Sequence, residues 1–167
     1  MGKVIGICLI WIAMTGLAWA EDIPEKIVSI KVSADKELVH PGGELTLTIK
    51  TKVSKEWHVQ GPKPDLDFLI PTSAVLEDGS TFELGDIAFP KTVEKKFDFL
   101  DKPVRVLHGS FKITALVRVD SEAKPGVAVI RGGLTCQPCN DAACLPPEKV
   151  KFTIPVMITR PKDNAKK

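Results

Sequence analysis

Leu45-Thr-Leu-Thr-Ile-Lys-Thr-Lys-Val53 is the stretch that decides the fold. Its apolar and polar residues alternate, so that one face is formed by Leu45, Leu47, Ile49 and Val53 and the other by Thr46, Thr48, Lys50 and Lys52. A period of two is the side-chain period of a β-strand, whose successive residues point to opposite faces. The stretch therefore predicts a strand with one buried face.

Similar short strand-like runs recur along the chain, at residues 27–32, 73–76, 81–84, 109–119, 127–134, 150–154 and 156–158. Residues suited to tight reversals separate several of them, at 40–44, 77–80 and 124–126. No long window has the period of a helix. Many short strands at turn spacing predict an all-β fold, an antiparallel β-sandwich.

Two segments lack a sustained period. Residues 55–72, with several prolines, predict a long ordered loop that wraps an edge or an end of the domain, with Trp57 in the core. Residues 90–104 are also expected to be irregular. Pro155 is expected to interrupt the last strand, at an edge or a bulge.

The N-terminus has the three parts of a secretory signal peptide. Lys3 is followed by an apolar run to Leu17, and Ala18-Trp-Ala20 supplies small residues two apart. We expect cleavage after Ala20, a domain over 21–160 and a basic flexible tail over 161–167. The alternative is a segment retained as a membrane anchor, although it is short for one.

The charges are nearly balanced. Of the 23 basic and 21 acidic residues, only Lys3 lies in the expected signal peptide. This balance argues against nucleic acid or an anionic membrane as the partner. After signal cleavage we expect no membrane insertion and export to an oxidising compartment.

The chemistry is concentrated in Cys136-Gln-Pro-Cys139-Asn-Asp-Ala-Ala-Cys144-Leu-Pro-Pro147, which holds three of the four cysteines. Cys8 leaves with the signal peptide, so an odd number of thiols enters an oxidising compartment. Cys139 can pair with Cys144 across a turn, or with Cys136 as a C-x-x-C, but not with both. A third thiol within reach allows internal exchange.

Three functions remain open for these cysteines. A structural disulfide in a secreted β-sandwich that binds a protein is one, and thiol–disulfide exchange is the second. The third is a thiolate metal-binding module. A structural zinc site would need a fourth ligand, from His40, His58 or His108.

The stretch from Gln137 to Pro147 resembles the active-site segment of the periplasmic N-terminal domain of DsbD, a transmembrane thiol:disulfide reductase. It is similar also to the related stand-alone disulfide bond corrector domains. Trp57-His58, Phe68-Leu-Ile-Pro-Thr72 and Phe89-Pro90 are similar to the upstream pattern of the same family. The resemblance covers most of residues 27–158.

The resemblance implies an immunoglobulin-like β-sandwich in which Cys139 and Cys144 are the catalytic pair, without a cofactor or a metal. It implies a protein-disulfide reductase type of activity. Electrons would arrive from a thioredoxin-like or DsbD/CcdA-type membrane donor and leave to periplasmic protein disulfides. An aromatic cap loop would cover the cysteines, with Lys96–Asp101 as the matching segment, Phe99 as the cap and Asp98 beside it.

The chain departs from the family at Cys136, which stands where the family has a tyrosine. This leaves open whether Cys136 or Cys144 pairs with Cys139 at rest, and it makes Cys136 a third candidate for the exchange. No transmembrane helices or thioredoxin-like domain follow the domain, so the donor is expected to be a separate protein.

Titratable residues near the motif can tune a thiolate. Lys149 is expected to favour it, whereas Asp141 or Glu148 would disfavour it. His58 and His108 are candidates for proton transfer, with a purely structural role as the alternative.

Overall fold

The computed structural model describes residues 26–77 and 81–160. The expected signal peptide 1–20, the tail 161–167 and most of the 77–80 turn lie outside the described residues. The described part contains strands and no α-helix, and it therefore has no helix that could cross a membrane.

The strands are β1 (Val28–Ala34), β2 (Leu38–Val39), β3 (Glu44–Val53), β4 (His58–Gln60), β5 (Ser73–Leu76), β6 (Phe82–Ala88), β7 (Val93–Lys95), β8 (Val104–His108), β9 (Ser110–Val119), β10 (Gly126–Cys136), β11 (Pro138–Cys139) and β12 (Glu148–Ile158).

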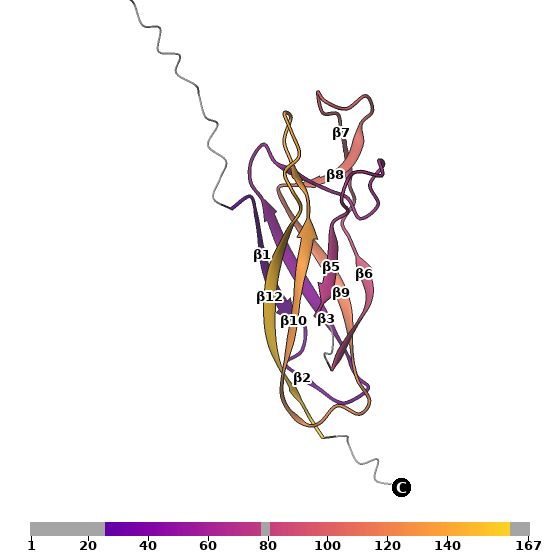
Figure 1. Cartoon of the computed structure of the whole chain (residues 1–167). Coiled ribbons are helices and arrows are strands. Elements are labelled where there is room, and N and C mark those ends of the chain that lie inside the picture. Colours follow the sequence, from indigo (N-terminus) through magenta and orange to yellow (C-terminus); the bar gives the residue numbers. More distant parts are fainter. Residues whose placement is uncertain (1–25, 78–80, 161–167) are drawn as a thin grey trace, which may run out of the picture.

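Two four-stranded sheets form the layers of a β-sandwich (Figure 1), with strand orders β1-β3-β9-β6 and β2-β12-β10-β5. Neighbouring strands are antiparallel except β2, which runs parallel to β12. Leu47 and Val117 of the first sheet share a core cluster with Ile130 and Val156 of the second. The predicted all-β, immunoglobulin-like sandwich is confirmed.

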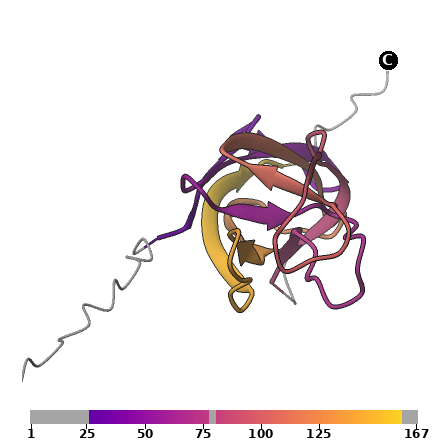
Figure 2. The same cartoon turned by 90° about the horizontal axis from the view of Figure 1, so that it is seen from above.

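A third sheet, β11-β4-β8-β7, lies at one end of the sandwich, at the top of Figure 1. Seen from above, the strands are arranged around the middle of the domain (Figure 2). Trp57, Val59 and Leu107 of this end pack with Val53 and Cys136 from the two main sheets. The third sheet is therefore joined to the sandwich through a shared apolar cluster, and Trp57 is a core residue as predicted.

The two segments expected to be irregular supply most of this third sheet. Residues 55–72 contain β4, and residues 90–104 contain β7 and the start of β8. The prediction of irregular structure was therefore wrong at β4 in the first segment and at β7 and the start of β8 in the second. Strands of two or three residues show too few side chains for a period of two to be visible in the sequence.

Pro155 does not interrupt the last strand. β12 is continuous, and Pro155 pairs with Val129 of β10. The amides of Met157 and Thr159 donate to β2 and its flank, away from β10. Backbone amides alternate in direction along a strand, so the nitrogen of Pro155 faces the same side as those of Met157 and Thr159. β2 pairs with β12 only at Met157 and Ile158, so no paired strand lies opposite the nitrogen of Pro155. An edge position, one of the two expected, therefore tolerates the proline.

Candidate functional site

Cys139 and Cys144 are joined by a disulfide, and Cys136 is a free, buried thiol. The bonded pair closes a tight hairpin, Pro138–Leu145, which we call the disulfide hairpin. The amide of Asn140 donates to Ala143 O at 2.9 Å, and the amide of Leu145 donates to Pro138 O at 2.8 Å. Cys139 and Cys144 lie opposite each other between these two hydrogen bonds and form a non-hydrogen-bonded pair. Strands approach closely at such pairs, and the Cα atoms of the two cysteines are 4.0 Å apart.

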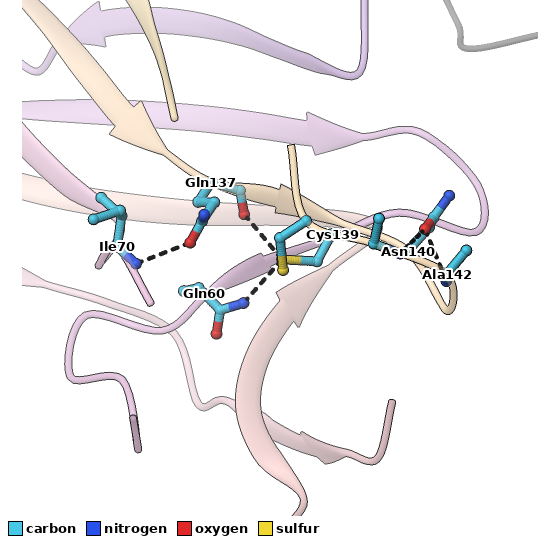
Figure 3. Close-up of a disulfide and its surroundings, with 8 residues drawn as sticks. Gln60, Ile70, Gln137, Cys139, Asn140 and Ala142 are labelled. Atoms are coloured by element: carbon cyan, nitrogen blue, oxygen red, sulfur yellow. Dashed lines mark hydrogen bonds between the residues drawn. A yellow bond between two sulfur atoms is a disulfide. The ribbon is translucent and has the colours of Figure 1, made fainter. Parts of the chain in front are cut away.

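Asn140 shapes the turn of this hairpin. Its side-chain Oδ1 accepts hydrogen bonds from the amides of Ala142 at 3.0 Å and Ala143 at 2.9 Å (Figure 3). An asparagine side chain that binds the backbone two and three residues ahead stabilises a chain reversal. The chain thus turns back between Cys139 and Cys144, as a bond between these two cysteines requires.

The two bonded cysteines differ in exposure. Cys139 is fully buried in a cluster with Leu69, Phe97 and Val106, whereas Cys144 is half-buried and packs against the outside of that cluster. A partner therefore meets Cys144 before Cys139.

Two glutamines surround the sulfur of Cys139. Gln60, from β4, donates Nε2–H to Cys139 Sγ at 3.2 Å, while the backbone oxygen of Gln137 lies 4.0 Å from the same sulfur. The side chain of Gln137 points elsewhere and accepts from the amide of Ile70 at 2.9 Å (Figure 3). One side chain thus contacts the sulfur and the other fastens the 61–72 loop beside it.

The aromatic segment Lys96–Asp101, the cap segment, lies against this site. Phe97 is fully buried in the cluster with both cysteines, and its ring centroid is 5.5 Å from that of Phe99. Phe99 is 41% exposed, so it is not an ordinary core residue. Phe99 and Asp98 line a shallow surface hollow together with Asp141 and Ala142 of the disulfide hairpin.

His58 lies next to Cys139 in the third sheet. It pairs with Cys139 on one side and with His108 on the other, and its ring stands edge-on to Phe97 with centroids 5.7 Å apart. Burial, and then the charge of Lys95, lower the pKa of His58 below 6.5. His58 is thus largely neutral at pH 7.

Cys136 lies in a different cluster, with Trp57 and Val59, and it is fully buried. Burial raises the pKa of its thiol from 9.0 to about 12, with a further contribution from Glu148, its partner across β10 and β12. A thiol with this pKa is protonated and unreactive at neutral pH. These observations argue against Cys136 as a participant in the exchange.

The remaining titratable candidates are dispersed. Glu148 pairs with Cys136 and Lys149 with Thr135, so neither belongs to the disulfide hairpin. His40 lies in the turn between β2 and β3, far from β4 along the sandwich. Within residues 26–77 and 81–160, no group of three or more His, Cys, Asp or Glu side chains is arranged to hold a metal ion.

Sequence analysis missed Gln60 as a residue of the site. It also did not recognise that Phe97, rather than Phe99, is the buried aromatic residue of the cap segment. Gln60 and Cys139 are 79 positions apart, and only the pairing of β4 with β11 brings them together. Phe97 and Phe99 stand two residues apart, a spacing that suggests one shared face and does not tell which ring is buried.

Comparison with known proteins gives one family match and several similar solved structures. The model of the family described as "Thiol:disulfide interchange protein DsbD, N-terminal" matches residues 28–155. The N-terminal periplasmic domain of ScsB from Proteus mirabilis aligns with a TM-score of 0.53 and 10% identity, over 80% of this chain and 48% of that one. The chain thus spans about half of that structure.

A second solved structure, the reduced form of the DsbD N-terminal domain from Neisseria meningitidis, aligns with a TM-score of 0.50 and 18% identity. The alignment covers 82% of this chain and 94% of that chain. No curated protein sequence matches. At these identities the two structures support the fold.

Proposed function

Because the chain belongs to the family of the N-terminal domain of the thiol:disulfide interchange protein DsbD, we propose that it relays reducing equivalents between proteins through Cys139 and Cys144. The donor is a thioredoxin-like protein or a membrane protein of the DsbD/CcdA type, and the acceptors are disulfides of periplasmic proteins. The relay takes place in the periplasm, after removal of residues 1–20.

The difference in exposure between the cysteines supports a different role for each. In the reduced domain, the thiolate of the more exposed Cys144 attacks one sulfur of an acceptor disulfide. The acceptor bond breaks, its other sulfur leaves as a thiolate, and a mixed disulfide with Cys144 forms. The thiolate of Cys139 then attacks Cys144 Sγ, which releases the acceptor's second sulfur as a thiolate and restores the bond. The donor reduces the domain by the same steps in reverse.

The observation that carries this proposal is the position of the disulfide. It closes a hairpin with only four intervening residues, at the end of the sandwich and beside an exposed aromatic segment. So short a closed loop constrains the unfolded chain less than a bridge between distant strands. The position therefore favours exchange over a structural role.

A redox titration in glutathione buffers, with mass spectrometry to locate the bond, tests the proposal. We expect a Cys139–Cys144 bond whose potential falls in the range of exchange proteins, about −120 to −270 mV. A bond below about −300 mV, which glutathione does not open, would contradict the proposal and leave a binding domain with a structural disulfide.

A further inference from the structure

Gln60 is a buried polar residue with only half of its amide satisfied. Its side chain is fully buried, and Nε2 donates to Cys139 Sγ at 3.2 Å (Figure 3). Oε1 is also buried and has no hydrogen-bond partner among the described residues. An unpaired amide oxygen costs stability, so packing alone does not explain a glutamine here.

Exchange at the hairpin places a negative charge on the sulfur that Gln60 contacts. When a donor thiolate attacks Cys144 Sγ, a new bond forms between the donor sulfur and Cys144. The Cys139–Cys144 bond breaks, and its electron pair remains on Cys139 Sγ as a thiolate. The surroundings of that sulfur include Leu69 and Phe97, and apolar burial disfavours a thiolate.

The two polar contacts of this sulfur act in opposite directions. The Gln60 N–H is a donor, and it stabilises the thiolate more than the neutral thiol. The backbone oxygen of Gln137, at 4.0 Å, is an acceptor, and it can only receive the S–H of the neutral thiol. Among the described residues, Gln60 supplies the one side-chain donor to Cys139 Sγ.

We propose that Gln60 is a positioning residue that holds its N–H on the sulfur of Cys139 and stabilises that thiolate in each half of the exchange. During reduction of the domain the Cys139 thiolate is the leaving group, and during reduction of an acceptor it is the resolving nucleophile. This inference rests on the proposed function, because only exchange generates the charge.

The test measures the thiol pKa of Cys139 directly. Cys8→Ala, Cys136→Ala and Cys144→Ala in the full chain leave Cys139 as the only cysteine, and the absorbance of its thiolate near 240 nm is followed against pH. Gln60→Met keeps the length of the side chain but removes the donor. We expect it to raise the pKa of Cys139 by about one unit, a tenfold smaller thiolate fraction at a given pH below the pKa.

Two further variants separate this role from a structural one. Gln60→Glu, which has the same shape and places an acceptor on the sulfur, is expected to raise the pKa further. Gln137→Met is the matched control, because it removes an amide that binds Ile70 and not the sulfur, and it is expected to leave the pKa unchanged. The inference is overturned if neither Gln60 variant shifts the pKa, or if Gln137→Met shifts it equally.

Stability and exchange rate complete the experiment. Because Gln60 Oε1 is unpaired, Gln60→Met is not expected to lower Tm, whereas a structural role would lower it. With all native cysteines present, Gln60→Met is expected to slow reduction by dithiothreitol by up to about tenfold, because a leaving thiolate of higher pKa leaves more slowly. If glutathione cannot open the bond, the proposed function fails and the role of Gln60 in exchange fails with it. If glutathione opens the bond but Gln60→Met leaves the pKa of Cys139 unchanged, only the inference about Gln60 fails.

Discussion

Lys95 Nζ lies 2.9 Å from Asp141 Oδ1, and this ion pair joins the end of β7 to the turn of the disulfide hairpin. The same ammonium group stands 5.9 Å from the ring centroid of Phe97, which is buried against both cysteines. Since β7 leads directly into the cap segment, we expect the ion pair to hold that segment against the disulfide. The two side chains are 32% and 60% exposed, so the contact is a weak one.

Removal of this ion pair is expected to make the disulfide more accessible. Lys95→Gln and Asp141→Asn should each speed reduction by dithiothreitol, up to about fivefold, because an exposed pair contributes at most about 1 kcal/mol. Stopped-flow or quenched reduction at pH 7 measures the rate. Glu44→Gln is the control. It breaks the exposed Glu44–Arg118 ion pair at the start of β3, which is not part of the third sheet or the disulfide hairpin, and it should leave the rate unchanged.

The direction of the two effects distinguishes a mechanical role from a purely electrostatic one. If the pair acts only through its charges, loss of the Asp141 carboxylate would favour the thiolate and loss of the Lys95 ammonium would disfavour it. The two variants would then change the rate in opposite directions, and the proposed closure of the cap segment by this pair would be wrong.

Phe97 and Phe99 are expected to differ sharply in their effect on stability. Phe97 is fully buried, so Phe97→Ala should lower the free energy of unfolding by about 3–5 kcal/mol. Phe99 is 41% exposed, and Phe99→Ala should change it by less than about 1 kcal/mol. Urea unfolding of the oxidised domain measures both values.

The cap role assigned to Phe99 from the family resemblance stays a prediction, and the same variants test it. If Phe99 covers Cys144, Phe99→Ala should speed reduction by dithiothreitol while stability is retained. Unchanged reduction in Phe99→Ala, together with faster reduction in the conservative Phe97→Leu, would instead assign the covering role to the buried ring.

Side-chain alternation predicted the long strands because each has one face in the core. β3 and β9 show this most clearly, since the fully buried Ile49 and Ile113 pair with each other across the two strands. The next residues, the exposed Lys50 and Lys112, form the following pair on the other face. A period of two is visible there over ten residues. The resulting sandwich could therefore be inferred from the sequence alone.

The candidate site could be predicted only in part, because it is assembled from very short strands. The cysteines and the turn at Asn140 were recognisable, since they are neighbours in the sequence. His58 and Gln60 come from β4, a strand of three residues, and they meet Cys139 through a pairing that no local pattern encodes. Burial likewise separates Cys136 from Cys139, although they are three positions apart.

His58 is expected to contribute to stability in a pH-dependent way. Its pKa in the folded protein is lowered, so the unfolded chain takes up a proton at a higher pH than the folded one does. The contribution is therefore present above pH 6.5 and is lost as the pH falls below this value. Unfolding in urea between pH 5 and 8 should show it, and NMR should show the His58 ring titrating below 6.5.

His58→Gln removes the titrating group and should flatten this part of the pH profile. His40→Gln, at the far end of the sandwich, is the control and should retain it. A profile that is equally steep in wild type and His58→Gln would contradict the assignment to His58.

Cys136 is expected to be chemically silent in the native domain. Its thiol is fully buried and has a pKa of about 12, so iodoacetamide at pH 8 should label it only after unfolding. Cys136→Ala should also leave the potential of the Cys139–Cys144 bond unchanged. Mass spectrometry of labelled native protein and the glutathione titration are the two measurements. Labelling in the folded state, or a shifted potential, would contradict this prediction and support Cys136 as a participant in the exchange.

The raised pKa of Cys136 also predicts a loss of stability in alkali. Above pH 9.0 the unfolded chain releases the thiol proton while the folded protein retains it up to about pH 12. Stability should therefore fall by about 1.4 kcal/mol per pH unit between these values. The informative quantity is the difference between wild type and Cys136→Ala, because this difference isolates the contribution of the thiol. That difference in stability should grow steadily from pH 9 upward. Parallel profiles for the two proteins would contradict the prediction, because the thiol would then ionise as readily in the folded chain as in the unfolded one.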